Sequence, residues 1–400
     1  MPGSRSCTGT PGDSWRCRQA DRHRIGLVLR RYEPIRSSGV TAATPLRIID
    51  PHVHYWDPRT TPRQITPLVK LFGRWPGLLD RLARAATPDP LIAFVGDPQY
   101  VLSAHLPADV RASAEHHLLE GIVHVEAGWT ARGTLGPVGE TQWLDRLDEP
   151  PLGIVAHATV DDPDALQAQL DAHSIASGRL RGIRDILAAH SDPQVHTWTD
   201  PDRIRSDALR VGLVTLGERS LTYEAWCYHE QLGDLADVIA DVPMTTFMLD
   251  HMGTPVGLAG SHRSQGETDR DRAQILDEWH AGLVAVAANP NVHCKLSGLL
   301  MPIVGFGFHE RVVRPSVGEV VDALGPHVMF GIETFGPERC QFASNFPMDK
   351  VSVDYATLWD AFIEIVGNAG LDRAQQHALL ADNAAAFYQL EVPDDAPPSA

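Results

Sequence analysis

Two histidines stand two residues apart in Asp50-Pro51-His52-Val53-His54, where an apolar run of the chain ends. In an extended chain, residues i and i+2 point to the same face, so both imidazoles can bind one metal ion or one substrate. The alternative is a pair of hydrogen-bonded histidines in the core. We expect a functional pair, because the carboxyl ends of parallel barrel strands are where such folds place their chemistry.

Ionisable residues end several other apolar runs in the same way. Glu126 lies among apolar neighbours, where a carboxylate costs free energy unless it is paired, so it is either a partner of the histidines or half of a salt bridge. Arg184 offers a planar fork that can hold an anionic or oxygen-rich substrate, with an ion pair inside the fold as the alternative. His157 and His251 each end a run, and His229 lies just past one.

Four further residues join the candidate site. Lys295 lies within an apolar run, and a buried lysine needs an anionic partner or a lowered pKa, both of which are typical of functional sites. The last run ends in Asn345, and Asp349 follows two residues after a proline. Trp56 follows the histidine pair and is a candidate to contact an apolar or ring-shaped substrate, although a tryptophan in a protein of this size is more often part of the core.

The elements that must position these residues are short apolar runs that alternate with helical stretches, a rhythm typical of a parallel α/β sheet. Eight runs predict the strands of a (β/α)₈ TIM barrel, because eight units favour closure over an open sheet. The predicted strands are 47–56, 121–127, 153–160, 180–186, 221–227, 245–251, 292–298 and 340–347. The predicted helices are 165–173, 231–240, 272–288, 317–324, 355–366 and 373–390.

The segments outside this rhythm predict the domain organisation. Long insertions follow the first strand (57–120) and the seventh (299–315), and we expect them to shape the substrate pocket. Residues 46–391 form one predicted barrel domain. Residues 1–45 are rich in Arg, Gly, Ser and Pro and are predicted to be a disordered extension, and 392–400 to be a tail.

Composition limits the possible partners and compartment. Lys and Arg number 34 against 51 Asp and Glu, a net charge of -17, and no basic run indicates a nucleic-acid surface. No apolar run is long enough to cross a membrane. The five cysteines form no CxxC pair and predict neither a disulfide framework nor a structural zinc site. We therefore expect a cytoplasmic protein that binds a small molecule and that can form a homo-oligomer.

Six fragments, in this order along the chain, carry a family resemblance. They are Ile49-Asp50-Pro51-His52-Val53-His54, Val125-Glu126-Ala127, Arg181-Gly182-Ile183-Arg184, Asp250-His251-Met252-Gly253, Lys295-Leu296-Ser297-Gly298 and Ser344-Asn345-Phe346-Pro347. From about residue 47 to 390 the chain resembles the amidohydrolase superfamily, specifically the branch with 2-pyrone-4,6-dicarboxylate lactonase and L-fuconolactonase. Nonoxidative decarboxylases are more distantly similar.

The resemblance implies ligands for a divalent metal, commonly zinc: His52, His54, His229 and His251. It also implies an aspartate at the eighth strand that takes the proton of the attacking water, but this chain has Asn345 there. An amide cannot accept that proton, so Asp349 or Glu126 becomes the candidate general base. Members of the lactonase branch that work without a metal imply a second possibility, in which the histidines with Arg184 or Lys295 polarise the carbonyl directly.

The function predicted from these residues is hydrolysis of a lactone or a similar cyclic ester or amide. The alternative is a metal-dependent decarboxylase of an aromatic or enol acid. A third hypothesis, motivated by Asn345, is a barrel that binds a small molecule without converting it.

Overall fold

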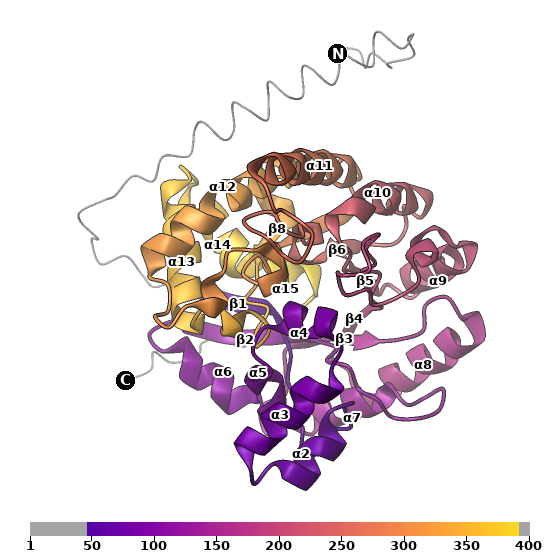
Figure 1. Cartoon of the computed structure of the whole chain (residues 1–400). Helices are drawn as coiled ribbons and strands as arrows, with labels where there is room; N and C mark the ends of the chain where they lie inside the picture. The colour runs from indigo at the N-terminus through magenta and orange to yellow at the C-terminus, as the bar shows by residue number, and fades with distance from the viewer. Residues whose placement is uncertain (1–45, 392–400) are drawn as a thin grey trace.

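A computed structural model describes residues 46–391, so the predicted extension and tail lie outside the described residues. Eight parallel strands pair in the order β1-β2-β3-β4-β5-β6-β7-β8. The last strand returns to the first through a parallel bridge between Val53 and Phe346, where the His54 amide donates to the Phe346 carbonyl at 2.8 Å. The predicted TIM barrel is confirmed, and Figure 1 shows its strands surrounded by helices.

Seven of the eight strands are shorter than the sequence runs that predicted them, and β2 begins three residues before its run. They are β1 (Arg47–Val53), β2 (Leu118–Val125), β3 (Gly153–His157), β4 (Leu180–Arg184), β5 (Thr222–Ala225), β6 (Phe247–Leu249), β7 (Val292–Leu296) and β8 (Cys340–Phe342). The last residues of most runs leave the sheet ladder and turn into the barrel mouth, as His54, Glu126 and His251 do. The polar residues at the ends of the runs therefore mark the barrel mouth more accurately than they mark the ends of the strands.

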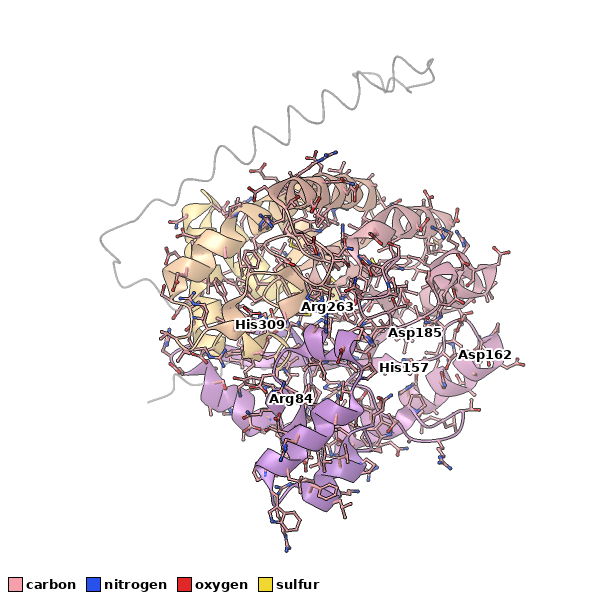
Figure 2. The ribbon with its side chains drawn as sticks, in the orientation of Figure 1. Arg84, His157, Asp162, Asp185, Arg263 and His309 are labelled. Carbon is pink, nitrogen blue, oxygen red and sulfur yellow. The ribbon has the colours of Figure 1, made fainter. Side chains whose placement is uncertain are left out.

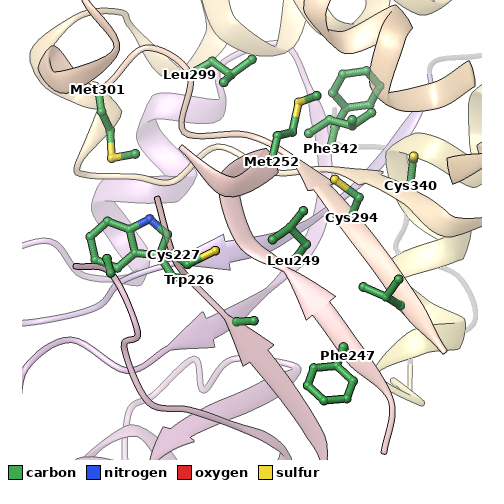
Figure 3. Packing of buried hydrophobic residues seen from close by; sticks show 14 of the residues in the cluster. Trp226, Cys227, Phe247, Leu249, Met252, Cys294, Leu299, Met301, Cys340 and Phe342 are labelled. Carbon is green, nitrogen blue, oxygen red and sulfur yellow. The ribbon is translucent and has the colours of Figure 1, made fainter. Parts of the chain in front are cut away.

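Alternation along each strand separates an apolar outer face from a polar interior. On β6 to β8 the outward residues belong to the hydrophobic core beneath the helices, and Figure 3 shows Phe247, Leu249, Cys294 and Phe342 in this layer. The residues between them point inward and include Lys295 on β7. The three described cysteines, Cys227, Cys294 and Cys340, are free and buried.

The helices follow the strands as the sequence predicts, together with further helices that it did not predict. They are α2 (Thr66–Phe72), α3 (Pro76–Ala86), α4 (Asp89–Val95), α5 (Gln99–Leu102), α6 (Pro107–Ala114), α7 (Val138–Asp145), α8 (Pro163–Ala176), α9 (Asp207–Glu218), α10 (Leu232–Asp241), α11 (Asp269–Ala287), α12 (Val317–Phe335), α13 (Tyr355–Asn368), α14 (Arg373–His377) and α15 (Asn383–Phe387). Prediction missed α7 and α9, and the insertion after β1 contains the five helices α2 to α6. No helix within residues 46–391 combines the length and the apolar character that a membrane crossing requires.

The C-terminal segment closes the floor of the barrel. After α14 a π-helical turn, Ala378–Asp382, leads into α15, so the single predicted helix 373–390 is interrupted. Tyr388, which is 1% exposed, packs against Val123, Val125 and Val155 inside the barrel. A residue from beyond the eighth strand thus fills the barrel from below.

Candidate active site

An ion cluster at the centre of the barrel is built around Lys295 of β7. The Lys295 Nζ lies 2.6 Å from Glu224 Oε2 on β5, 3.2 Å from Asp250 Oδ1 and 3.1 Å from His52 Nδ1. All four side chains are fully buried. The predicted anionic partner of the buried lysine is therefore a pair of carboxylates.

The two carboxylates differ in how they are held. Tyr388 donates from its hydroxyl to Glu224 Oε1. Burial, and next the charge of Asp250, raise the pKa of Glu224 to about 7, against the opposing effect of Lys295. Asp250 contacts Lys295 as an ion pair, but both of its oxygens lack an aligned hydrogen-bond donor among residues 46–391.

Sequence reasoning did not single out Glu224 or Asp250. The usable signal was strand alternation, because Glu224 is an inward position between the outward Tyr223 and Ala225. Asp250 precedes His251 directly, so it leaves the end of β6 with that histidine.

Arg184 at the end of β4 is clamped by Glu126 from the end of β2. The Arg184 Nε and Nη2 donate to Glu126 Oε1 at 3.0 and 2.8 Å, and Nη2 also donates to the Glu126 carbonyl at 2.7 Å. Burial opposes ionisation of Glu126, but Arg184 overcomes it and holds the pKa of that carboxyl at about 2. The remaining nitrogen, Nη1, faces His52 Nε2 at 3.4 Å.

Three imidazoles meet beside this ion pair. The ring of His52 lies 4.9 Å from that of His54 and 4.5 Å from that of His251, between centroids. Burial, followed by neighbouring cations, lowers the pKa of all three well below the ordinary histidine value. The three rings are therefore neutral near pH 7.

The proton positions of one ring follow from its partner. His54 Nδ1 lies 2.8 Å from the Val125 carbonyl, which can only accept, so Nδ1 carries the proton and Nε2 keeps its lone pair. His251 Nδ1 pairs with the Ser297 hydroxyl at 2.9 Å, and this contact permits either tautomer.

The backbone around His251 is unusual. His251 and Met252 have φ values of 54° and 53°, in the left-handed region that disfavours residues with a Cβ. Gly298 lies against the His251 ring, and a Cβ there would come within 2.4 Å of it. Such strain is typical of positions that a surrounding structure holds for a function.

The structure places the other predicted residues around this centre. His157 Nδ1 lies 3.3 Å from the Arg184 carbonyl, and Figure 2 labels His157 at the end of β3. Trp56 stacks on His54 with the ring centroids 6.4 Å apart. His229 lies against His190 (6.5 Å between ring centroids) and its Nδ1 pairs with the Val256 amide, so its described partners are not the three imidazoles.

Asn345 and Asp349 bind each other. The Asn345 Nδ2 donates to Asp349 Oδ1 at 2.9 Å, and burial raises the pKa of Asp349 to about 7. Asp349 lines a small internal cavity with Leu324 and Phe362, behind the strand ends. Asn345 has a φ of 57°, a conformation that asparagine tolerates better than most residues, so it also shapes the turn after β8.

Helix α4 of the first insertion covers the mouth. Its Phe94 packs at a tilt against Trp226, whose ring lies 6.2 Å from that of His251. Arg263, in the segment after β6, donates to the carbonyl of Asp89 at 2.7 Å, and Figure 2 shows Arg263 and His309 next to this helix. A cavity of about 650 Å³ lies elsewhere in the insertion, among α2, α3 and α5.

Two groups of side chains within residues 46–391 have donor atoms close enough for one metal ion. One is His52 with Glu224 and Asp250, and the other is His116 with His117 and Asp360. In the first group the Lys295 ammonium nitrogen lies within 3.2 Å of all three members. The trio of His52, His54 and His251 is not a further such group.

Comparisons with known proteins place the chain among amidohydrolases. The amidohydrolase family model matches residues 49–390. An uncharacterized protein of Sinorhizobium fredii, y4mH, is 30% identical over 86% of this chain and 99% of its own length. An L-fucono-1,5-lactonase of Burkholderia multivorans is 29% identical over 54% of this chain and 66% of its own length.

Solved structures share the fold. A crystal structure of an amidohydrolase from Burkholderia multivorans with bound HEPES has a TM-score of 0.64 at 23% identity, and one with bound zinc has 0.61 at 22%. Each comparison covers 86% of this chain and 100% of the other.

Proposed function

Because the chain belongs to the amidohydrolase family, we propose that it opens a lactone or a similar cyclic ester by water attack on a polarised carbonyl. The observation that carries this proposal is the pairing of a neutral base with a fixed cation at the mouth. His54 and Arg184 are anchored on consecutive carbonyls, those of Val125 and Glu126. The lactonase activity named for the Burkholderia multivorans relative supports the substrate class.

In this proposal His54 is the general base. Its Nε2 holds a lone pair because Nδ1 is committed to Val125, and its lowered pKa keeps it neutral at neutral pH. It takes a proton from water as the water oxygen attacks the carbonyl carbon. When the ring C–O bond breaks, the departing alkoxide takes that proton, and the product is a hydroxy acid.

Arg184 stabilises the oxyanion in the same proposal. Glu126 occupies two edges of the guanidinium, which leaves Nη1 to face the developing charge. A donor that is already fixed in place needs no reorganisation when charge develops. Glu126 and Asp349 then act through their partners rather than as bases, because one is held by Arg184 and the other by Asn345.

A divalent metal does not fit the cluster of His52, Glu224 and Asp250 as the side chains stand. The Lys295 ammonium fills the space between these donors, and Arg184 Nη1 faces the other nitrogen of His52. We therefore assign no step to a metal and propose that Arg184 supplies the positive charge at the reacting carbonyl.

The proposed substrate is rich in oxygen. The guanidinium carbon of Arg63 lies 4.3 Å over the ring of Trp56, and Trp56 in turn stacks on His54. The Nη1 atom of Arg63 has no hydrogen-bond partner among the described residues. A buried guanidinium nitrogen without a hydrogen-bond partner is typical of a group that meets a substrate carboxylate or hydroxyl. With the fork of Arg184 engaged by Glu126, Arg63 becomes the anion-recognising residue of the proposal.

The test is a panel of sugar and dicarboxylate lactones in weak buffer with a pH indicator, after chelator treatment of a tag-free protein. We expect acid release from at least one lactone. His54→Asn, which keeps a donor for Val125, should lower kcat by about 10²–10⁴-fold. His377→Asn removes an imidazole on α14, outside the site, and should leave kcat unchanged, and Arg63→Met should mainly raise KM.

Other outcomes would overturn the proposal. Release of CO₂ from carboxylated phenols, with no lactone opened, would assign the decarboxylase alternative instead. Thermal stabilisation by a lactone without any turnover would indicate a barrel that only binds.

A further inference from the structure

We propose a metal site, for Zn²⁺ or a similar transition-metal ion, on the outside of the barrel where the start of β2 meets α13. Its ligands are His116, His117 and Asp360, with the carbonyl of Ala356 as a fourth. The two histidines lie between α6 and β2, at the N-terminal end of that strand, and the other two residues lie on α13. The site is independent of the proposed hydrolytic function.

The donor atoms stand at the spacing of a coordination shell. Asp360 Oδ1 lies 2.9 Å from His116 Nε2 and 3.4 Å from His117 Nε2, and the Ala356 carbonyl lies 3.2 Å from His117 Nε2. Zinc-nitrogen and zinc-oxygen bonds of about 2.0–2.2 Å at tetrahedral angles separate ligands by about 3.4 Å. Two imidazoles and a carboxylate are ligands that zinc commonly takes.

The backbone brings both imidazoles to one side. Neighbouring residues of an extended chain point to opposite faces, yet the rings of His116 and His117 lie 4.2 Å apart between centroids. The preceding residue, Glu115, has a φ of 51°, a conformation that a residue with a Cβ rarely adopts. This turn aligns the two Nε2 atoms on the same carboxylate oxygen.

The site is open to an ion from solvent. The side chains of His116 and Asp360 are 60% and 35% exposed, whereas that of His117 is 4% exposed. The position of the proposed site gives it a structural role. The site joins the unit before β2 to the helix after β8, and these two parts of the chain are 244 residues apart. A bound ion would thus clamp the first and last units of the barrel together.

The experiment is a Zn²⁺ titration of the full, tag-free chain after chelator treatment, compared between variants that differ by one side chain. Wild type should bind one more equivalent than His116→Gln or Asp360→Asn. Glu364→Gln removes a carboxylate one turn away on α13 and should bind as wild type does. Zn²⁺ should raise the unfolding temperature of wild type and Glu364→Gln only, while lactone hydrolysis stays equal in all four proteins.

A second probe is Co²⁺, whose visible absorption reports the coordination geometry of the bound ion. The extra band should be absent from His116→Gln. Equal numbers of bound ions in wild type, His116→Gln and Asp360→Asn would overturn the site. Binding only at millimolar Zn²⁺, without a change in unfolding temperature, would also overturn it as a structural clamp.

Discussion

Lys295 stabilises two carboxylates that water cannot reach. A buried ion pair contributes little net stability, but removing one partner leaves an uncompensated charge. The ammonium touches Glu224, Asp250 and His52 and has no exposed surface, so it acts on a substrate only through these neighbours. We therefore regard it as a positioning residue.

Lys295→Met is expected to lower the free energy of unfolding by about 3–5 kcal/mol, because Glu224 and Asp250 would remain buried without a cation. Urea denaturation measures the change. The double variant Lys295→Met/Glu224→Gln removes one charge of each sign and should recover part of the loss. If the double variant is less stable than the single one, the ion pair is not what Lys295 contributes.

Asp349→Asn is expected to change how stability depends on pH. The folded protein holds the proton of Asp349 up to about pH 7, whereas the unfolded chain releases it near 3.8. Between these values the unfolded state binds fewer protons, so this group lowers stability as the pH rises. This difference in the pKa of Asp349 between the folded and unfolded states corresponds to a change in unfolding free energy on the order of 4 kcal/mol.

The measurement is the difference in unfolding free energy between wild type and Asp349→Asn across that pH range. As the pH rises, Asp349→Asn should become more stable relative to wild type. Buried histidines such as His105 titrate in both proteins and cancel in it. A constant difference would contradict the raised pKa.

At the scale of elements, α4 separates the imidazoles from solvent. Phe94 is 3% exposed and contacts both Trp198 and Trp226, so one side chain closes an aromatic layer over His251. We therefore expect a substrate to reach the site only when this helix moves. Lids of this kind commonly affect kcat and KM together.

Phe94→Ala is expected to open that layer. Acrylamide should quench tryptophan fluorescence more strongly than in wild type, and kcat/KM for the lactone should fall by about ten-fold as water enters the site. Leu78→Ala truncates an exposed residue of α3 in the same insertion and serves as the control. Unchanged quenching in Phe94→Ala would show that α4 does not form the lid.

The same elements show how far sequence reasoning reaches. The eight strands were predictable because each combines an apolar outer face with a polar end, and both signals are local. The helices of the first insertion were not, because α2, α4 and α5 have seven residues or fewer and the insertion lies outside the strand–helix rhythm on which the prediction relied. The sequence could not decide whether Arg184 and Glu126 pair with each other or with other groups, because only the closed barrel brings the ends of β2 and β4 together.

For the whole molecule, closure depends on residues distant in sequence. The histidine pair, Arg184 and Lys295 were predictable by type and position, but their partners Asp250 and Glu224 became evident only when β1, β5 and β7 faced one another. Tyr388 could not be found in this way, because it belongs to no strand and enters the barrel from the floor.

Tyr388→Phe is expected to lower the free energy of unfolding by about 1–3 kcal/mol, because Glu224 loses a buried hydrogen-bond donor. Thermal and urea unfolding measure this loss. Tyr100→Phe removes a hydroxyl that contacts Arg314 near the surface and should change stability by less than about 0.5 kcal/mol. Equal effects of the two variants would remove Tyr388 from the buried network.

Because Tyr388 fills the floor of the barrel, its place in the chain also determines when the barrel can be completed during translation. This residue is synthesised after all eight strands, so a nascent chain that stops short of it carries a barrel whose lower apolar lining faces water. Exposed lining of that kind is what chaperones and proteases recognise. We therefore expect the barrel to be complete only once the segment that carries Tyr388 has left the ribosome.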